Sequence, residues 1–224
     1  MAAIVAISLT CLLPIGTLLF AWQKKGLSIW LAGALAFTVA QLLIRLPLLQ
    51  WIQAMPTVRL FAVMQPFIWL VVLALTASIV EECARYIVFK AFKKAASNEG
   101  AFLYGLGHGG IEALLLVGIP IIVHLASYSD ASLYGGSVER LLAMVAHICF
   151  SLIVVQAVLR QQIRYVGYAI VAHALFNIVG AWVATRYTSL VVIEGIILLE
   201  VMGLMVVTII IVKGNGYEKG RMDN

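Results

Sequence analysis

Long apolar runs separated by short polar stretches make up most of this chain. A helix needs about 20 apolar residues to cross the hydrocarbon core of a bilayer. Runs of that length lie at 3–22, 27–48, 66–89, 101–123, 138–159, 165–184 and 191–212. The pattern therefore predicts an all-α, polytopic membrane bundle of about seven transmembrane helices.

The connection between the second and third runs has a different character. Residues 49–65 contain Pro56 and Trp51. Proline disfavours helix interiors, and tryptophan is enriched at membrane–water interfaces. We expect this segment to lie along the interface, so that residues 1–65 form an N-terminal hairpin and interfacial segment before a core at about 66–184.

Composition supports a single membrane domain over residues 1–224. The chain is 63% hydrophobic and 11% charged, with a mean hydropathy of +1.06. Soluble domains carry about a quarter charged residues, and no polar stretch here is long enough for a second, soluble domain. Cys11, Cys83 and Cys149 all lie in apolar runs, and we interpret them as small buried hydrophobes.

Basic residues between the runs predict the orientation, because cytoplasmic loops carry the excess of Lys and Arg. An N-out, C-in chain places Lys24, Lys25, Lys90, Lys93, Lys94, Arg160, Arg164, Lys213, Lys219 and Arg221 inside, and Arg45, Arg59, Arg140 and Arg186 outside. Residues 213–224 then form a cytoplasmic tail. The net charge of +5 lies mainly in these loops. We expect a multi-pass protein of a bacterial plasma membrane, surrounded by lipids and without a nucleic-acid partner.

Four of the runs contain residues that a lipid environment makes costly. The four sets are Glu81-Glu82-Cys83-Ala84-Arg85, His108-Gly-Gly-Ile-Glu112, His147-Ile-Cys-Phe-Ser151 and His173-Ala-Leu-Phe-Asn177. Ionisable residues inside a membrane normally face the bundle interior and take part in function. At ~1.5 Å per residue, all four sets lie roughly 12–20 Å from the inner surface. We therefore predict that they converge on one buried polar site.

The first set offers a general base. Glu81 and Glu82 are adjacent, about 100° apart on a helix, so only one can point fully at a given partner. Arg85 lies one turn away, within reach of either carboxylate. We expect one glutamate to pair with Arg85 and the other to activate water. The alternative is a structural ion pair that locks two helices together.

The histidines of the other sets suit either metal binding or direct participation in a reaction. His108 and Glu112 stand one turn apart, as two metal ligands or as a histidine oriented by a carboxylate. With His147 and His173 they are candidate zinc ligands that leave a position for water. His173 and Asn177 are alternatively candidates for donating to a developing oxyanion. Zinc-dependent and metal-free chemistry both stay open.

Two further features lie inside the runs. The residues around His108 are unusually rich in glycine, which allows either close helix approach or a local break in the helix. Those glycines are Gly105, Gly107, Gly109 and Gly110. Glu200 falls near the middle of the seventh run, where it either pairs with an arginine or supports the polar site.

The motifs together resemble a known family. Glu-Glu-x-x-Arg at 81–85, Gly-His-Gly-Gly-Ile-Glu at 107–112 and His-Ala-Leu-Phe-Asn at 173–177 are similar to the YhfC family of membrane peptidases. That family is related to PrsW-type and CAAX-processing intramembrane proteases. The resemblance covers residues 68–180, and the joint occurrence of the motifs is more specific than any one of them.

The resemblance implies a glutamate-dependent intramembrane peptidase. In CAAX-type relatives, one glutamate of the first motif activates water together with a histidine of the second. By that similarity the water belongs to the glutamate pair and His108, and the oxyanion to His173 and Asn177. Arg85 is one residue closer to the glutamates than in the CAAX pattern, so which glutamate pairs with it stays open. Relatives also differ over whether a metal is required.

The leading hypothesis is an intramembrane peptidase that cleaves a membrane-associated protein or peptide in or near the inner half of the bilayer. One alternative is a non-catalytic scaffold or receptor-like partner, which would tolerate Glu-to-Gln changes. Another is a proton- or metal-coupled transporter, which needs polar residues continuing towards both surfaces. The almost wholly apolar stretches 114–123 and 66–75 disfavour such a path.

Overall fold

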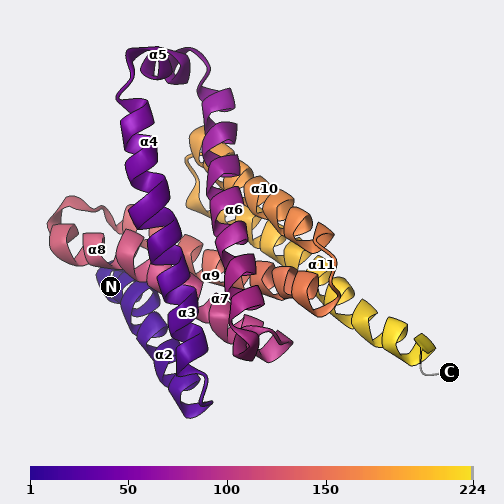
Figure 1. Ribbon diagram of the computed structural model, residues 1–224. Helices are drawn as coiled ribbons and strands as arrows, with labels where there is room; N and C mark the ends of the chain where they lie inside the picture. Colours follow the sequence, from indigo (N-terminus) through magenta and orange to yellow (C-terminus); the bar gives the residue numbers. More distant parts are fainter. Residues whose placement is uncertain (223–224) are drawn as a thin grey trace.

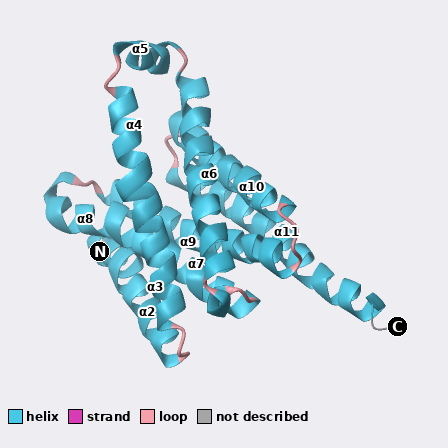
Figure 2. Cartoon of the chain, in the orientation of Figure 1, coloured by secondary structure: helices cyan, strands magenta, loops and turns pink. Residues whose placement is uncertain are grey.

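The computed structural model describes residues 1–222, with side chains through Gly214 (Figure 1). Those residues are helical with short connections and contain no strand (Figure 2). Within them, seven helical stretches are long and apolar enough to cross a membrane, as the sequence predicts. The stretches are Ala2–Gln23, Leu27–Gln53, Pro66–Ala91, Asn98–Ser127, Asp130–Leu159, Arg164–Arg186 and Leu190–Gly214.

Three of the spans are assembled from consecutive helical elements. The first consists of α1 (Ala2–Ile7), η1 (Ser8–Leu12) and α2 (Leu13–Gln23), and the second of α3 (Leu27–Phe37), η2 (Thr38–Arg45) and α4 (Leu46–Gln53). The fourth consists of α7 (Asn98–Ala113), η4 (Leu114–Gly118), α8 (Ile119–His124) and η5 (Leu125–Ser127). The elements η1, η2 and η4 are π-helical, and each precedes a helix with proline in its first turn. A wider turn accommodates the proline ring and its missing N–H without ending the span.

The connection after the second span differs from the prediction. Residues 49–53 continue that span as part of α4, because the π-helical turn before Pro47 lets the helix run on. Only α5 (Pro56–Met64) forms a separate short helix, which joins α4 to α6 (Pro66–Ala91) at one end of a long hairpin (Figure 1). Neither α4 nor α5 contains a buried residue.

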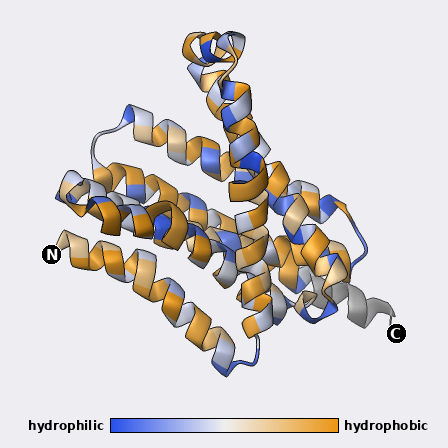
Figure 3. Ribbon diagram, turned by 60° about the vertical axis from the view of Figure 1, so that its left-hand side comes forward, coloured by the Kyte–Doolittle hydropathy of each residue, from blue (hydrophilic) through white to orange (hydrophobic). Residues whose placement is uncertain are grey.

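Helix α9 (Asp130–Leu159) is the central helix of the bundle. Most of its apolar stretch is buried, whereas less than half is buried in each of the other spans. It packs against α7, α6, α10 (Arg164–Arg186) and α11 (Leu190–Met222). Figure 3 shows hydrophobic residues along most of every helix, with hydrophilic ones concentrated at the connections and at a few positions inside the bundle. The predicted tail, 213–224, is helical through Met222 as the end of α11, and residues 223–224 lie outside the described residues.

Glycine lets α7 pack tightly against its neighbours. A Cβ atom at Gly107 would lie 2.0 Å from the Trp30 carbonyl oxygen on α3, and one at Gly105 would lie 2.6 Å from the Ile148 Cα on α9. Because α7 continues unbroken through this stretch, the glycines serve close approach and do not break the helix. This packing holds His108 at a fixed position between three helices.

An apolar groove lies on the outside of the bundle, between α3, η2 and α6. It has a volume of about 510 Å³ and is lined by small residues that include Ala36, Ala40 and Cys83. The interpretation of all three cysteines as buried is therefore wrong for Cys83, whose side chain is exposed. The reason is its position on α6, on the face opposite the polar residues.

Candidate active site

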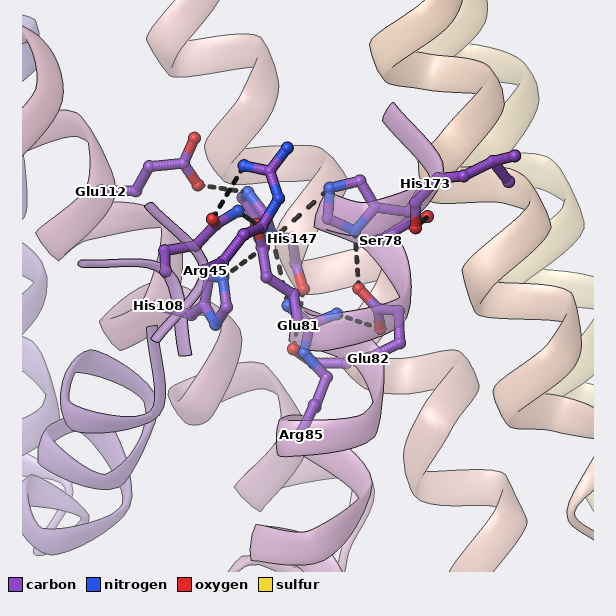
Figure 4. Close-up of polar contacts among 12 residues, drawn as sticks. Arg45, Ser78, Glu81, Glu82, Arg85, His108, Glu112, His147 and His173 are labelled. Atoms are coloured by element: carbon purple, nitrogen blue, oxygen red, sulfur yellow. Dashed lines mark hydrogen bonds and ion pairs between the residues drawn. The ribbon is translucent and has the colours of Figure 1, made fainter. Parts of the chain in front are cut away.

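The polar sets predicted from the sequence converge inside the bundle (Figure 4). Helix α6 contributes Glu81, Glu82 and Arg85, α7 contributes His108 and Glu112, α9 contributes His147, and α10 contributes His173. Apart from Glu112, each of these residues is at most 4% exposed. The contacts between their side chains show that these residues meet at one place inside the bundle.

Glu82 has both carboxylate oxygens occupied by strong donors. Arg85 Nη1 donates to Oε2 at 2.5 Å, and His173 Nδ1 lies 2.7 Å from Oε1. Arg85 and Glu82 are both fully buried, and three residues separate them on one helix. The arginine therefore pairs with the second glutamate, which answers the question that the sequence left open.

Glu81 has a different set of partners. Its Oε2 lies 2.9 Å from His108 Nε2 and 4.0 Å from His173 Nε2. Its Oε1 accepts a hydrogen bond from Gln41 Nε2 on η2. Among the described residues it forms no ion pair with an arginine or lysine, so this carboxylate faces imidazole rings and a neutral amide.

A third carboxylate, Glu112, lies at the edge of the site. Arg140 Nη1 donates to its Oε1 at 2.7 Å, and His147 Nε2 lies 2.5 Å from its Oε2. The contact with His147 lacks hydrogen-bond geometry, which leaves Oε2 buried without a hydrogen bond. On the other side of the imidazole, Arg85 Nη2 lies 3.2 Å from His147 Nδ1. Because guanidinium groups only donate, Nδ1 accepts in this contact.

Glu81, His108, Glu112 and His147 form a group that suits a metal ion. Each offers one ligand atom, and these atoms lie within 4.8 Å of one another. Carboxylate oxygen and imidazole nitrogen are common zinc ligands, and the unbonded Glu112 Oε2 and His108 Nδ1 leave ligand capacity unused. The donor set therefore fits a divalent metal, with one condition: a histidine that ligates through Nε2 carries its proton on Nδ1. Ligation by His147 through Nε2 thus requires release of the Arg85 contact.

The membership of this group differs from the predicted ligand set. His108, Glu112 and His147 are present, but Glu81 takes the place predicted for His173. The reason is that His173 comes from α10 on the far side of Glu82, and its Nδ1 is engaged with that carboxylate. Its ring stacks on Phe150, with centroids 4.6 Å apart.

Three other residues lie apart from this network. Asn177 is half-buried one turn after His173, and its side chain forms no hydrogen bond within the described part of the chain. Ser151 donates to the His147 carbonyl of its own helix at 2.7 Å. Glu200 is half-buried, and within residues 1–214 its Oε2 has no hydrogen-bond partner and it pairs with no arginine.

Sequence reasoning missed three residues of the network. The predicted motifs do not include Gln41, and the pattern of loop charges places Arg45 and Arg140 on the outer side. The structure gives Arg45 and Arg140 polar partners inside the bundle. One signal was present in the sequence, since Gln41 and Arg45 are spaced i,i+4 within an apolar run.

Comparison with known proteins places the chain in a family. The family model described as YhfC intramembrane metalloprotease matches residues 9–125 and 117–198. The uncharacterized membrane protein YhfC of Bacillus subtilis (strain 168) is 27% identical over 201 residues, which cover 75% of this chain and 78% of that protein. No solved structure matches the chain. The family match includes every residue of the polar network, and the chain therefore belongs to the YhfC family.

Proposed function

We propose that this chain is an intramembrane peptidase that uses Glu81 as its general base. The observation that carries the proposal is the different use of two adjacent glutamates. Glu82 is held by Arg85 and His173, whereas Glu81 faces His108 and pairs with no arginine within the described part of the chain. A structural lock between helices needs only one carboxylate. Burying the second carboxylate, that of Glu81, in a low-dielectric site costs free energy. A role as a general base would explain why the chain keeps it there.

The geometry supports a plain hydrolytic sequence. Glu81 Oε2 takes a proton from a water molecule, and the oxygen of that water attacks the carbonyl carbon of the peptide bond. The same carboxyl group then returns the proton to the leaving amine as the C–N bond breaks. His108 holds Glu81 from one side, and His173 Nε2 faces the same space from the other. We assign His173 to the carbonyl oxygen of the substrate as an imidazolium, which donates its Nδ1 proton to Glu82 and its Nε2 proton to that oxygen.

If a metal ion binds, Glu81, His108, Glu112 and His147 would hold it, and Glu81 would then be a ligand instead of the general base. When bound, Zn²⁺ would activate water and polarise the carbonyl group as a Lewis acid. Other residues of this chain hold the ligands in position. Arg140 orients Glu112 from outside the group, and the close packing of α7 keeps His108 in place.

The substrate class follows from burial. The site lies inside the membrane-spanning part of the bundle, so we propose a membrane-associated protein or peptide as the substrate. We place the cleavage in or near the inner half of the bilayer of a bacterial plasma membrane, in agreement with the predicted N-out, C-in orientation. The family description as an intramembrane metalloprotease supports the same reaction class.

The test compares protein termini in membranes of cells that express the wild-type chain, Glu81→Gln or Glu99→Gln. Glu99 is exposed and serves as the matched control. We expect new termini with wild type and the control, and a loss of about 10²- to 10⁴-fold with Glu81→Gln, the usual contribution of a general base. The same termini at the same abundance in all three would overturn the proposal.

One observation favours a second candidate, a proton- or metal-coupled transporter. Arg140 donates to Glu139 at 2.5 Å and to Glu112 at 2.7 Å. Side-chain exposure falls along this chain from 46% at Glu139 to 16% at Arg140 and 13% at Glu112. Polar groups therefore connect the surface with the site. Uptake of Zn²⁺ or protons into vesicles that contain the protein, abolished by Glu139→Gln, would favour transport over hydrolysis.

A further inference from the structure

The N-terminal hairpin supplies a side chain to the candidate active site. Gln41 lies on the π-helical element η2, is buried, and donates from Nε2 to Glu81 Oε1. The residue lies outside the predicted core at 66–184 and outside all the motifs that identify the family resemblance. Its contact with the proposed base is direct.

Arg45 fixes the orientation of the Gln41 amide. Its Nη1 donates to Gln41 Oε1 at 3.1 Å. A guanidinium group has only donors, so it must bond the oxygen of the amide, and the NH₂ group is then the one that faces Glu81.

Arg45 is itself held by the helix that carries the base. Its Nη2 donates to the Leu73 carbonyl oxygen at 2.7 Å, and its Nε and Nη2 each lie 3.3 Å from Thr76 Oγ1. A closed circuit of hydrogen bonds therefore runs from Leu73 and Thr76 on α6 through Arg45 and Gln41 and back to Glu81 on α6. The circuit ties η2 to α6 at two levels.

The circuit fixes the orientation of the Glu81 carboxylate, with one oxygen on Gln41 and the other facing the imidazoles. With Oε1 engaged by Gln41, Oε2 is the oxygen near His108 and His173. A neutral amide donates a hydrogen bond to a carboxylate but brings no positive charge, whereas a guanidinium group adds the attraction between opposite charges. Gln41 can therefore orient Glu81 without pairing its charge, as Arg85 pairs that of Glu82.

We propose that Gln41, oriented by Arg45, is a positioning residue for Glu81. The N-terminal hairpin therefore contributes residues that shape the site. The positioning of the carboxylate stands on contacts alone. Its effect on hydrolysis rests on the proposed function of Glu81.

The kinetic test uses a substrate identified from the new protein termini. Gln41→Met keeps the side-chain length and removes the donor, and Gln50→Met makes the same change at an exposed position of α4. We expect Gln41→Met to lower kcat by about 10- to 100-fold, which corresponds to the loss of a hydrogen bond to a charged group, with KM unchanged. Arg45→Met lowers kcat in the same way, and Arg45→Lys, which retains one donor, restores part of it.

A second measurement separates this proposal from the function of the site. Thermal unfolding of Gln41→Met, Glu81→Met and the double variant forms a cycle that needs no substrate. We expect the Tm shifts to be non-additive, because each single change removes the same contact. Additive shifts would overturn the positioning proposal whatever the activity. Non-additive shifts together with full cleavage by Glu81→Gln would overturn the proposed function and leave the contact standing. Wild-type kcat in Gln41→Met, with Glu81→Gln inactive, would again overturn positioning.

Discussion

Glu81 and Glu82 are neighbours in sequence but belong to two different polar regions. The Glu82 region contains a fully buried arginine and a histidine that hold both oxygens. The Glu81 region contains imidazole rings and a neutral amide, with no arginine or lysine paired to the carboxylate among the described residues. The Glu82 region is an ion-paired network that holds neighbouring helices together, whereas the Glu81 region leaves the Glu81 carboxylate available for chemistry.

One helix, α6, provides both the ion-paired carboxylate of Glu82 and the available carboxylate of Glu81. Residues 81 and 82 point about 100° apart, so they meet different neighbouring helices. Glu82 turns towards α10, and Glu81 turns towards α7 and η2. Two adjacent carboxylates are therefore not redundant, because the packing around α6 gives each its own partners.

The largest effect is expected from breaking the lock. Arg85→Met leaves Glu82 buried without its cation, and loss of one partner of a buried pair costs about 3–5 kcal/mol. Thermal or denaturant unfolding in detergent measures this cost against Arg59→Met, a change of the same type at an exposed position. Arg85→Met combined with Glu82→Met should recover much of the loss. A variant as stable as wild type would show that Arg85 and Glu82 do not form a lock.

A smaller effect is expected from neutralising the two glutamates one at a time. Glu82→Gln weakens charge-assisted bonds to Arg85 and His173, whereas Glu81→Gln removes no ion pair with an arginine or lysine of residues 1–214. We expect Glu82→Gln to reduce the free energy of unfolding by about 2 kcal/mol more than Glu81→Gln, because hydrogen bonds between charged groups contribute more than neutral ones. Equal destabilisation by both changes would remove the distinction between the two regions.

Most of the fold could be predicted from the sequence, because span length and hydropathy depend on the chain alone. The predicted end of the second span at residue 48 was wrong, since a π-helical turn before Pro47 lets the helix continue to Gln53, and apolarity does not reveal such a turn. The glutamates and histidines of the four polar sets meet, as helical rise predicts, whereas Asn177 lies apart from them.

The partners inside the site could not be predicted in the same way. Arg85 is within reach of either glutamate by spacing, and only the packing of α10 and η2 selects Glu82. Arg140 lies near the predicted start of a span, where an arginine usually marks the membrane edge. Its bond to Glu112 depends on how closely α7 and α9 approach each other. The glycines of α7 allow this close approach, but their presence in the sequence does not predict it.

The smallest predicted effect concerns affinity for Zn²⁺ and tests which residues belong to the Glu81 region and which to the Glu82 region. Glu112 belongs to the metal-suited group together with Glu81, whereas His173 is engaged with Glu82. We expect Glu112→Gln to weaken Zn²⁺ binding at least about tenfold and His173→Gln to weaken it less, because ligands matter more directly than residues outside the group. Calorimetric titration of the purified protein with Zn²⁺ measures both. Equal weakening by the two changes would place His173 among the ligands after all, and no Zn²⁺ binding by the wild-type chain would leave hydrolysis to Glu81 and the histidines alone.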